Sequence, residues 1–505
     1  MRLGKMENLN ENENINKGPI MIGLCIAVLI ACLDSTVVAT CGPIIVRDLG
    51  GEDVYSWILT AYLLCSTIMI PIAGKLSDLY GRKLFLFIGL ALFAAGSLLA
   101  GMCQEMGQFI ACRCIQGLGG GILIPVSTAA VGDLYDITDR AKMQGILGAA
   151  YGIGSGAGPL LGGFLTEYFS WHWAFYINIP LVIVCALLIT HGYPRVKAPD
   201  NVSIDVRGIT VLSLLLIDVL LLMEWGGREF EWSGMESILM IVAAMVLVAL
   251  FVFIEKRALE PVLSPRLIRN GVVVKSALFM FIMGLTMMGA NTYIAFFGIN
   301  VLGFSAMETG WYAMAMVAGM IITTKVSGAT VYRIGYRPWL IAGPVLGAAG
   351  LYLMSLIEAD SGTGIIVVSL FLFGLGVGCF LSIIMTAVQN SAEDNEVGMT
   401  TSAVNLLRNV GSTMGTAVFT MIINNGIASR MNDLVPETIP QIIADLLPKD
   451  TSIVVAARIP DLAMISDDLI WTFVDSVGTA FNFAAVILVL LVPVGLVYRA
   501  KRPSR

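Results

Sequence analysis

Two residues of opposite charge lie inside stretches of the chain that are otherwise apolar. Asp34 lies in the first apolar stretch, residues 19–40, and Arg113 lies in the fourth, residues 107–132. A carboxylate in hydrocarbon is costly enough to be a functional candidate by default, because the lipid cannot solvate its charge. Such an acid can bind and release a proton, so the chemistry that it offers is proton transfer.

The two charges are expected to meet. Counted at 1.5 Å per residue from the helix ends, Asp34 and Arg113 both lie roughly 8–10 Å below the same membrane surface. Opposite charges at one depth in a low-dielectric medium are expected to pair. Two roles remain open for this pair: it couples proton movement to another process, or it is a purely structural ion pair.

A glycine-rich segment, residues 145–163, lies in another apolar stretch. In a membrane helix, glycine removes the side chain that would keep a neighbouring backbone away. At 100° per residue the glycines form two bare stripes on nearly opposite sides: Gly145, Gly148 and Gly152 on one, and Gly154, Gly158 and Gly162 on the other. This helix is therefore expected to be contacted from two directions, and Pro159 is expected to bend it.

A short polar segment, residues 74–83, joins two apolar stretches and reads GKLSDLYGRK. Gly74 and Gly81 allow a tight turn, and the carboxylate of Asp78 can cap the N-terminus of a helix. Arg82 and Lys83 favour a cytoplasmic position for the loop, because positively charged loops stay on that side of a membrane. Taken alone, the segment is also compatible with a simple basic hairpin.

The composition predicts an all-α integral membrane protein. Hydrophobic residues make up 57% of the 505 residues and charged residues 13%, about half the charged fraction of a soluble domain. The apolar stretches are roughly 18–25 residues long, which is enough to cross the hydrocarbon core. Nine cysteines without a CxxC pair, and only two histidines, favour neither disulfides nor a metal site. The sequence contains no nucleophile–base cluster, so neither an enzyme nor a nucleic-acid-binding protein is expected.

Fourteen membrane spans are predicted, at residues 19–40, 53–73, 84–103, 107–132, 142–166, 173–192, 207–223, 236–254, 274–299, 307–326, 338–357, 364–388, 399–424 and 477–498. An even number places both termini on one side. Most loop Lys and Arg residues fall on that side, and all tryptophans except Trp339 fall near the opposite surface. Both patterns indicate cytoplasmic termini in a multi-pass protein of the cell membrane.

An internal repeat divides the chain into two halves. The segments that begin at Gly117 and Gly154 recur 257 residues later, at Gly374 and Gly411, and the segment at Gly74 recurs 254 residues later. Repeats at nearly one offset indicate a duplicated six-helix unit. The predicted organisation is a disordered cytoplasmic tail (1–18), a six-helix bundle (19–192), a linker with two extra helices (193–260), a second bundle (261–498) with a long extracellular loop (425–476), and a basic cytoplasmic tail (499–505).

Four motifs in this order resemble those of the major facilitator superfamily, and in particular its fourteen-helix drug–proton antiporter family. They are LDSTVV from Leu33 to Val38, the segment 74–83, RCIQG from Arg113 to Gly117, and the spaced glycines Gly145, Gly154, Gly158 and Gly162 with Pro159. The sequence departs from the family at Ala39, where asparagine is usual, and at His172, where arginine is usual. The resemblance implies two six-helix bundles related by a pseudo-two-fold repeat, with the two extra helices inserted between them.

The resemblance also implies roles for individual residues. Segment 74–83 latches the two halves in the outward-open state, with Asp78 engaging the second half and Arg82 reaching Asp133. Arg113 takes part in proton movement together with Asp34. The spaced glycines pack the helix tightly. From this packing we expect Gly158 to lie at the interface between the halves.

These features together predict a proton-coupled multidrug efflux antiporter that works by alternating access and needs no cofactor besides the proton gradient. The expected partners of this monomer are the lipid bilayer, protons, and amphipathic substrates that are cationic, because an acid in an apolar cavity attracts cations. Candidate substrate contacts are Gln116, Met287, Asn291, Tyr293 and Asn405. Two alternatives remain: an exporter of one endogenous metabolite, lipid or peptide, and a transport-inactive membrane sensor or scaffold.

Overall fold

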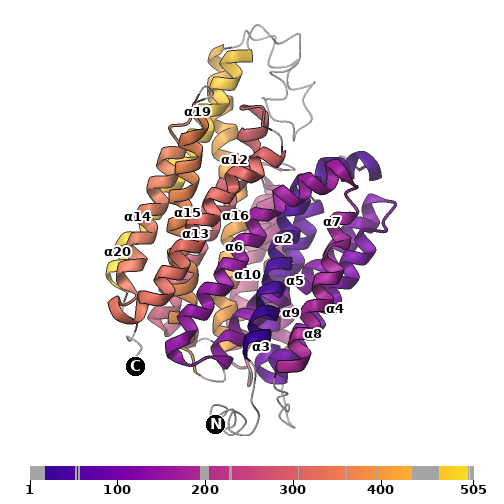
Figure 1. Ribbon diagram of the computed structural model, residues 1–505, viewed down its shortest axis with the longest axis vertical. Coiled ribbons are helices and arrows are strands. Elements are labelled where there is room, and N and C mark those ends of the chain that lie inside the picture. The colour runs from indigo at the N-terminus through magenta and orange to yellow at the C-terminus, as the bar shows by residue number, and fades with distance from the viewer. Residues whose placement is uncertain are drawn as a thin grey trace.

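The computed structural model describes residues 17–500 except 52–53, 55–56, 194–203, 227–229, 265, 305, 359–360, 394–395, 435–465 and 499. The expected tails fall almost entirely outside the described residues. The described chain forms a bundle of long helices that lie side by side (Figure 1). This is the arrangement expected of apolar helices, because each satisfies its backbone hydrogen bonds internally and can therefore lie in lipid.

The helices fall into three groups along the chain. The first half contains α2 (Lys17–Leu49), α3 (Trp57–Tyr80), α4 (Arg82–Ala100), α5 (Met106–Leu134), α6 (Ile137–Tyr168), α7 (Trp173–Tyr176) and α8 (Asn178–Gly192). The inserted hairpin contains α9 (Val206–Trp225) and α10 (Met235–Glu255). The second half contains α11 (Arg266–Arg269), α12 (Gly271–Asn300), α13 (Ala306–Ile334), α14 (Arg337–Met354), α15 (Thr363–Gln389), α16 (Val397–Leu434), α19 (Ser466–Val489) and α20 (Leu491–Leu496).

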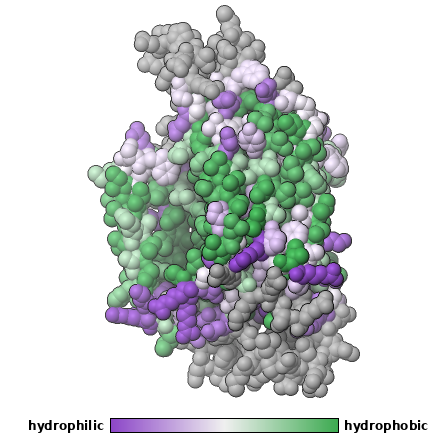
Figure 2. Space-filling model, turned by 90° about the vertical axis from the view of Figure 1, so that its left-hand side faces the viewer, coloured by the Kyte–Doolittle hydropathy of each residue, from purple (hydrophilic) through white to green (hydrophobic). Residues whose placement is uncertain are grey.

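Within the described residues, 12 helices are long and apolar enough to cross a membrane. Figure 2 shows a broad band of hydrophobic residues across the middle of one face of the molecule. The predicted spans that are not among the twelve correspond to α6 and α14, which have 32 and 18 residues. Glycines and charged residues lower the hydropathy of α6, although this helix packs closely against α2 and α13 inside the bundle. The count of fourteen spans therefore remains a prediction.

The segment expected as a loop at residues 425–476 is partly helical. α16 continues to Leu434, and α19 begins at Ser466. A helix does not have to end where the hydrocarbon ends, because its backbone groups remain paired within the helix. Apolar length measures only the part of the helix that is in lipid, so the sequence underestimated the length of both helices.

Both ends of the described chain lie at one end of the bundle, which we call the terminus end (Figure 1). Here the hydroxyl of Tyr135 donates to the carbonyl of Lys17 at 3.3 Å, and Nε of Arg337 donates to the carbonyl of Tyr498 at 2.8 Å. The opposite end, which holds Trp171 and Gly101, is called the far end below. The prediction that both termini share one side is consistent with this arrangement.

The repeat seen in the sequence reappears as repeated packing. Gly117 of α5 brings this helix against the backbone of Tyr62 in α3, and Gly374 of α15 brings that helix against the backbone of Met316 in α13. In the same way, Gly411 of α16 lies against the backbone of α12, as Gly154 of α6 lies against the backbone of α2. A Cβ atom at these positions would collide with backbone, which is why each position requires glycine.

The halves join along two seams, α6 against α13 and α3 against α16. The inserted hairpin lies beside the second seam, because α9 packs on both α3 and α16. The chain that follows the hairpin is tied to the first half by an ion pair of 2.5 Å between Nζ of Lys75 and Oε2 of Glu260. One large apolar core lies mainly in each half, and a smaller cluster joins Ile70 of the first half to Leu406 of the second. The halves are therefore two packed bodies with an interface between them.

Candidate functional site

Asp34 and Arg113 form the ion pair that the sequence predicts. Nη1 of Arg113, on α5, lies 2.5 Å from Oδ2 of Asp34, on α2, and neither side chain has any exposed surface. The pair lies entirely within the first half. Removing one partner would leave the other charge buried and uncompensated, which typically costs about 3–5 kcal/mol.

Three polar side chains that were not predicted as part of the pair complete its surroundings. Nε2 of Gln116 donates to Oδ1 of Asp34 at 2.6 Å and to Oγ of Ser97 at 2.7 Å, and Nδ2 of Asn178 donates to Oδ1 of Asp34 at 3.2 Å. Both carboxylate oxygens of Asp34 are therefore hydrogen-bonded. Ser97 and Asn178 come from α4 and from the start of α8, so no local sequence pattern could have joined them to Asp34.

Arg113 is held from several sides as well. Its Nε donates to the carbonyl of Ile58 at 3.1 Å, and its guanidinium carbon lies 4.5 Å from the ring centre of Tyr62. Its Nη2, which is buried, has no hydrogen-bond partner among the described residues. The carboxylate of Asp34 accepts hydrogen bonds from Arg113, Gln116 and Asn178, so the contacts of Asp34 and Arg113 depend on each other.

Segment 74–83 makes the contacts that its resemblance implies. Oδ1 and Oδ2 of Asp78 accept hydrogen bonds from the backbone nitrogens of Gly398 and Met399, at 3.1 and 2.8 Å. These nitrogens belong to the first turn of α16 in the second half, where the helix dipole favours a negative charge. Asp78 thus caps a helix, as its residue type predicts, but the helix belongs to the other half.

Arg82 connects Asp78 to the rest of the first half. Its Nη2 forms an ion pair with Asp78, and its Nε lies 2.8 Å from Oδ2 of Asp133 at the end of α5. Lys83 donates to the carbonyls of Thr190 and Tyr193 at 3.0 and 2.9 Å. The positive φ of 97° at Gly81 allows the turn between α3 and α4.

Gly74 allows α3 to approach the second half. A Cβ atom at this position would lie 2.9 Å from the carbonyl oxygen of Gly398 and would collide with Ser402. Further hydrogen bonds between the halves gather at the same end: Arg140 with Asn390 at 3.1 Å, and Gln144 with Gln389 at 3.1 Å. The two halves are therefore in close contact at the terminus end.

The glycine-rich helix α6 is contacted from two directions, as predicted. A Cβ atom at Gly145 would lie 3.0 Å from the carbonyl oxygen of Thr324 in α13, and Gly148 and Gly152 face the same helix. A Cβ atom at Gly154 would lie 2.7 Å from the carbonyl oxygen of Leu29 in α2. One stripe therefore packs on the second half and the other on the first.

The expected position of Gly158 at the interface between the halves is wrong. Gly158 and Gly162 lie with Gly154 on the stripe that faces α2, against Thr36 and Thr40 of the same half. The sequence predicted two bare faces correctly, but a stripe of glycines does not record which neighbouring helix it meets. The inter-half contact belongs to the stripe that begins at Gly145.

Comparison with known proteins agrees with this geometry. The sequence model described as "Major Facilitator Superfamily" matches residues 24–416. The chain belongs to the major facilitator superfamily. Multidrug transporter protein MdtP of Bacillus subtilis (strain 168) is 35% identical over 432 residues, which cover 85% of this chain and 80% of that protein. Multidrug resistance protein 3 of the same organism is 32% identical over 415 residues, covering 82% and 81%.

Solved structures show the same fold. The human organic anion transporter MFSD10 matches with a TM-score of 0.64 at 14% identity, covering 95% of this chain and 99% of that one. The proton:xylose symporter XylE matches with a TM-score of 0.56 at 14% identity, covering 93% and 94%. This chain is thus a membrane transporter of the superfamily and not an enzyme, and efflux proteins are among its relatives.

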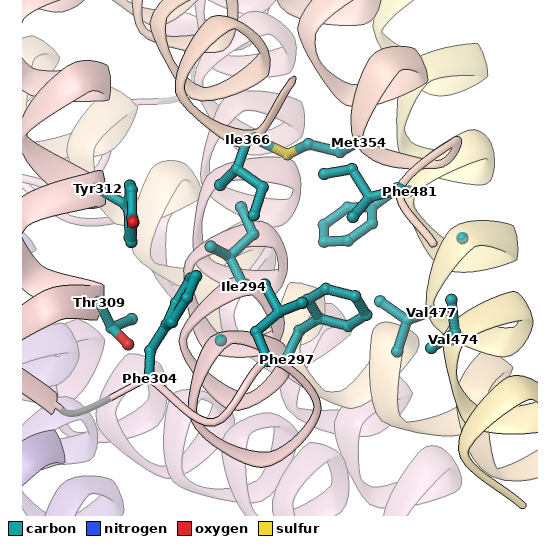
Figure 3. Close-up of a pocket in the computed structure, with 14 residues that line it drawn as sticks. Ile294, Phe297, Phe304, Thr309, Tyr312, Met354, Ile366, Val474, Val477 and Phe481 are labelled. Atoms are coloured by element: carbon teal, nitrogen blue, oxygen red, sulfur yellow. The ribbon is translucent and has the colours of Figure 1, made fainter. Parts of the chain in front are cut away.

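A pocket in this transporter lies in the second half, near the far end, between α12, α13, α14, α15 and α19. It holds about 490 Å³ of space, including space open to solvent, and its lining is almost wholly apolar. In Figure 3, Ile294 and Phe297 of α12 lie between Tyr312 on one side and Phe481 on the other. Such a lining suits apolar groups without selecting their charge.

None of the five predicted substrate contacts lines this pocket. Gln116 lies instead in the ion-pair cluster, and Met287 and Asn405 are buried within the transporter. Asn291 is half-buried, and the hydroxyl of Tyr293 donates to Oγ1 of Thr420 in α16 at 2.8 Å. Residue type and depth identified polar and adaptable side chains, but these properties do not determine which helix face borders a cavity.

Proposed function

We propose that this transporter is a proton-coupled efflux antiporter that exports amphipathic compounds by alternating access. The observation that carries the proposal is the fully buried ion pair of Asp34 and Arg113. A charge pair in hydrocarbon is expensive to maintain, and a hydrophobic replacement would often stabilise a protein equally well. A titratable group in such a position is best explained by proton exchange during transport.

The contacts support a route from protonation to movement. Protonation of Asp34 would discharge the acceptor of Arg113, Gln116 and Asn178 and weaken the hydrogen bonds within the first half. α2, which carries Asp34, also packs against the second glycine stripe of α6, and α6 packs on the second half. A change at Asp34 can therefore bias the interface between the halves through two adjacent helices.

Orientation and location belong to the same proposal. We place the terminus end in the cytoplasm and the transporter in the cell membrane, because the basic loops lie at that end. The contacts of Asp78 with α16 then hold the cytoplasmic side closed, so this conformation faces outward. We also propose that the protein transports as a monomer, and that the proton gradient drives transport without any cofactor.

The hydrogen bonds of Asp34 bear on the charge of the exported compounds. The sequence predicts cationic substrates because an acid in an apolar cavity attracts cations. In the structure both of its oxygens are already engaged, by Arg113, Gln116 and Asn178. Cation binding at Asp34 would require these bonds to break first.

The names of the relatives favour export of several compounds over the alternative of a single endogenous metabolite, lipid or peptide. The intact ion pair and inter-half contacts disfavour a transport-inactive scaffold. A panel of anionic and cationic fluorescent dyes, tested for export from cells that overproduce the protein, separates export of several compounds from the other two functions, since neither of these predicts export of the panel.

The central experiment measures proton release from proteoliposomes when a transported dye is added. The Asp34→Asn variant keeps the size of the side chain and removes its titration, so we expect it to lose proton release while still binding dye. Asp48→Asn, on the same helix, is the matched control, since Asp48 accepts a hydrogen bond from Nε1 of Trp171 at 2.8 Å, away from the pair. Proton release from Asp34→Asn at the wild-type rate would show that coupling occurs elsewhere.

A further inference from the structure

A second arginine lies at membrane depth, and the ion-pair cluster does not use it. Arg408 is the twelfth residue of α16, which begins at Val397, so it lies about 16 Å along the helix from the terminus end. Only 5% of its surface is exposed. Arginine remains charged in proteins, so a positive charge lies near the middle of the bundle.

The guanidinium of Arg408 faces the first half. Its central carbon lies 4.7 Å from the ring centre of Tyr151 in α6. The side chain therefore extends from α16 of the second half to α6 of the first half.

No acid among the described residues neutralises this charge. Arg408 forms no ion pair or side-chain hydrogen bond within that part of the chain, whereas Arg113 has Asp34. Asp218 of the neighbouring α9 has a buried carboxylate oxygen without a partner, so it does not serve Arg408 either. The nitrogens of Arg408 are not among the buried unpartnered atoms, so they border space that water can reach.

These contacts distinguish Arg408 from a structural arginine. A nearly buried charge without a counter-ion is costly. The ring of Tyr151 covers one face of the guanidinium, which leaves the N–H groups at its edge free to donate. A planar fork of donors fits a carboxylate with two parallel hydrogen bonds.

We propose that Arg408 is the binding site for the anionic group of the exported compound, and that this transporter prefers amphipathic anions, carboxylates above all. The inference rests on the proposed efflux of amphipathic compounds and replaces the expectation of cationic ones. Arg408 belongs to the second half and its neighbour Tyr151 to the first. A bound carboxylate therefore lies between the halves, where alternating access must expose it.

The test is equilibrium binding to the full-length protein in lipid nanodiscs, with empty nanodiscs as the blank. The probes are a xanthene dye with a free carboxylate and the methyl ester of the same dye, which differ in one negative charge. Fluorescence polarisation gives both dissociation constants. Hydrogen bonds between charged groups correspond to a preference of about tenfold to a hundredfold for the carboxylate.

Three variants assign the preference to Arg408. Arg408→Gln is expected to bind both dyes equally, and Arg408→Lys to keep a reduced preference, because lysine retains the charge without the fork. Arg333→Gln, at an exposed arginine of α13, is the control and should match the wild type. If Arg408→Gln does not fold, the ratio of the two dissociation constants in Arg408→Lys decides whether the preference depends on Arg408.

Two results would overturn the proposal: a wild-type protein that binds the ester as tightly as the carboxylate, and an arginine variant that keeps the full preference. Neither depends on proton coupling, because binding is measured at equilibrium without a gradient. Failure of proton release in the Asp34 experiment and failure of anion preference here are therefore separate outcomes.

Discussion

The contact of Asp78 with the first turn of α16 predicts how strongly the terminus end is held closed. Asp78→Asn keeps the shape of the side chain and removes its charge. We expect the variant to open at the terminus end more often than the wild type, because two hydrogen bonds between the halves lose their charged acceptor.

The magnitude follows from those two bonds. A hydrogen bond to a charged group contributes about 1 kcal/mol more than one to a neutral group, and one of the two acceptor oxygens becomes an NH2 group that cannot accept, so the loss is at least about 2 kcal/mol. That energy changes the ratio of closed to open molecules by about thirtyfold. The bond between Asp78 and Arg82 does not enter this sum, since both residues belong to the first half and stay together in either state.

The assay is a distance distribution between two spin labels across the terminus end. Leu84 of α4 is 51% exposed and Ile268 of α11 is 76% exposed, so labels at these positions disturb little packing. The expected result is a larger population of long distances in Asp78→Asn than in the wild type, with Asp48→Asn unchanged. An Asp78→Asn distribution that matches the wild type would refute the claim that this contact holds the halves together.

Two further predictions concern packing and orientation. Gly158→Leu should lower the midpoint of thermal unfolding, because its Cβ would lie 3.0 Å from the backbone of Thr36 within one half, an overpacking that typically costs about 1–3 kcal/mol. Gly152→Leu should reduce transport with a smaller loss of stability, since the new side chain meets the flexible end of Met320. Equal decreases in the unfolding midpoint of the two variants would contradict this distinction. In intact cells, an impermeant maleimide should label a cysteine at Gly362 but not one at Leu259, which is 88% exposed at the terminus end. The reverse pattern would contradict the proposed orientation.

The sequence by itself determined the features that depend on the cost of placing a group in lipid. Apolar length located the spans, and two charges at one depth predicted the pair of Asp34 and Arg113, because hydrocarbon penalises an isolated charge whatever the surrounding fold. The spaced glycines likewise predicted close backbone contact on two faces of α6. Each of these inferences needs only the residues of one or two helices.

Tertiary structure alone decided which helices meet. It placed Gly158 against α2 rather than against the second half, and brought Asn178 to Asp34 and Ser97 to Asn178. It also left Arg408 beside Tyr151, without a counter-ion among the described residues. These contacts join residues that are far apart in the chain. A helix face of given composition can pack on several neighbours at similar cost, so only the assembled bundle determines its partner.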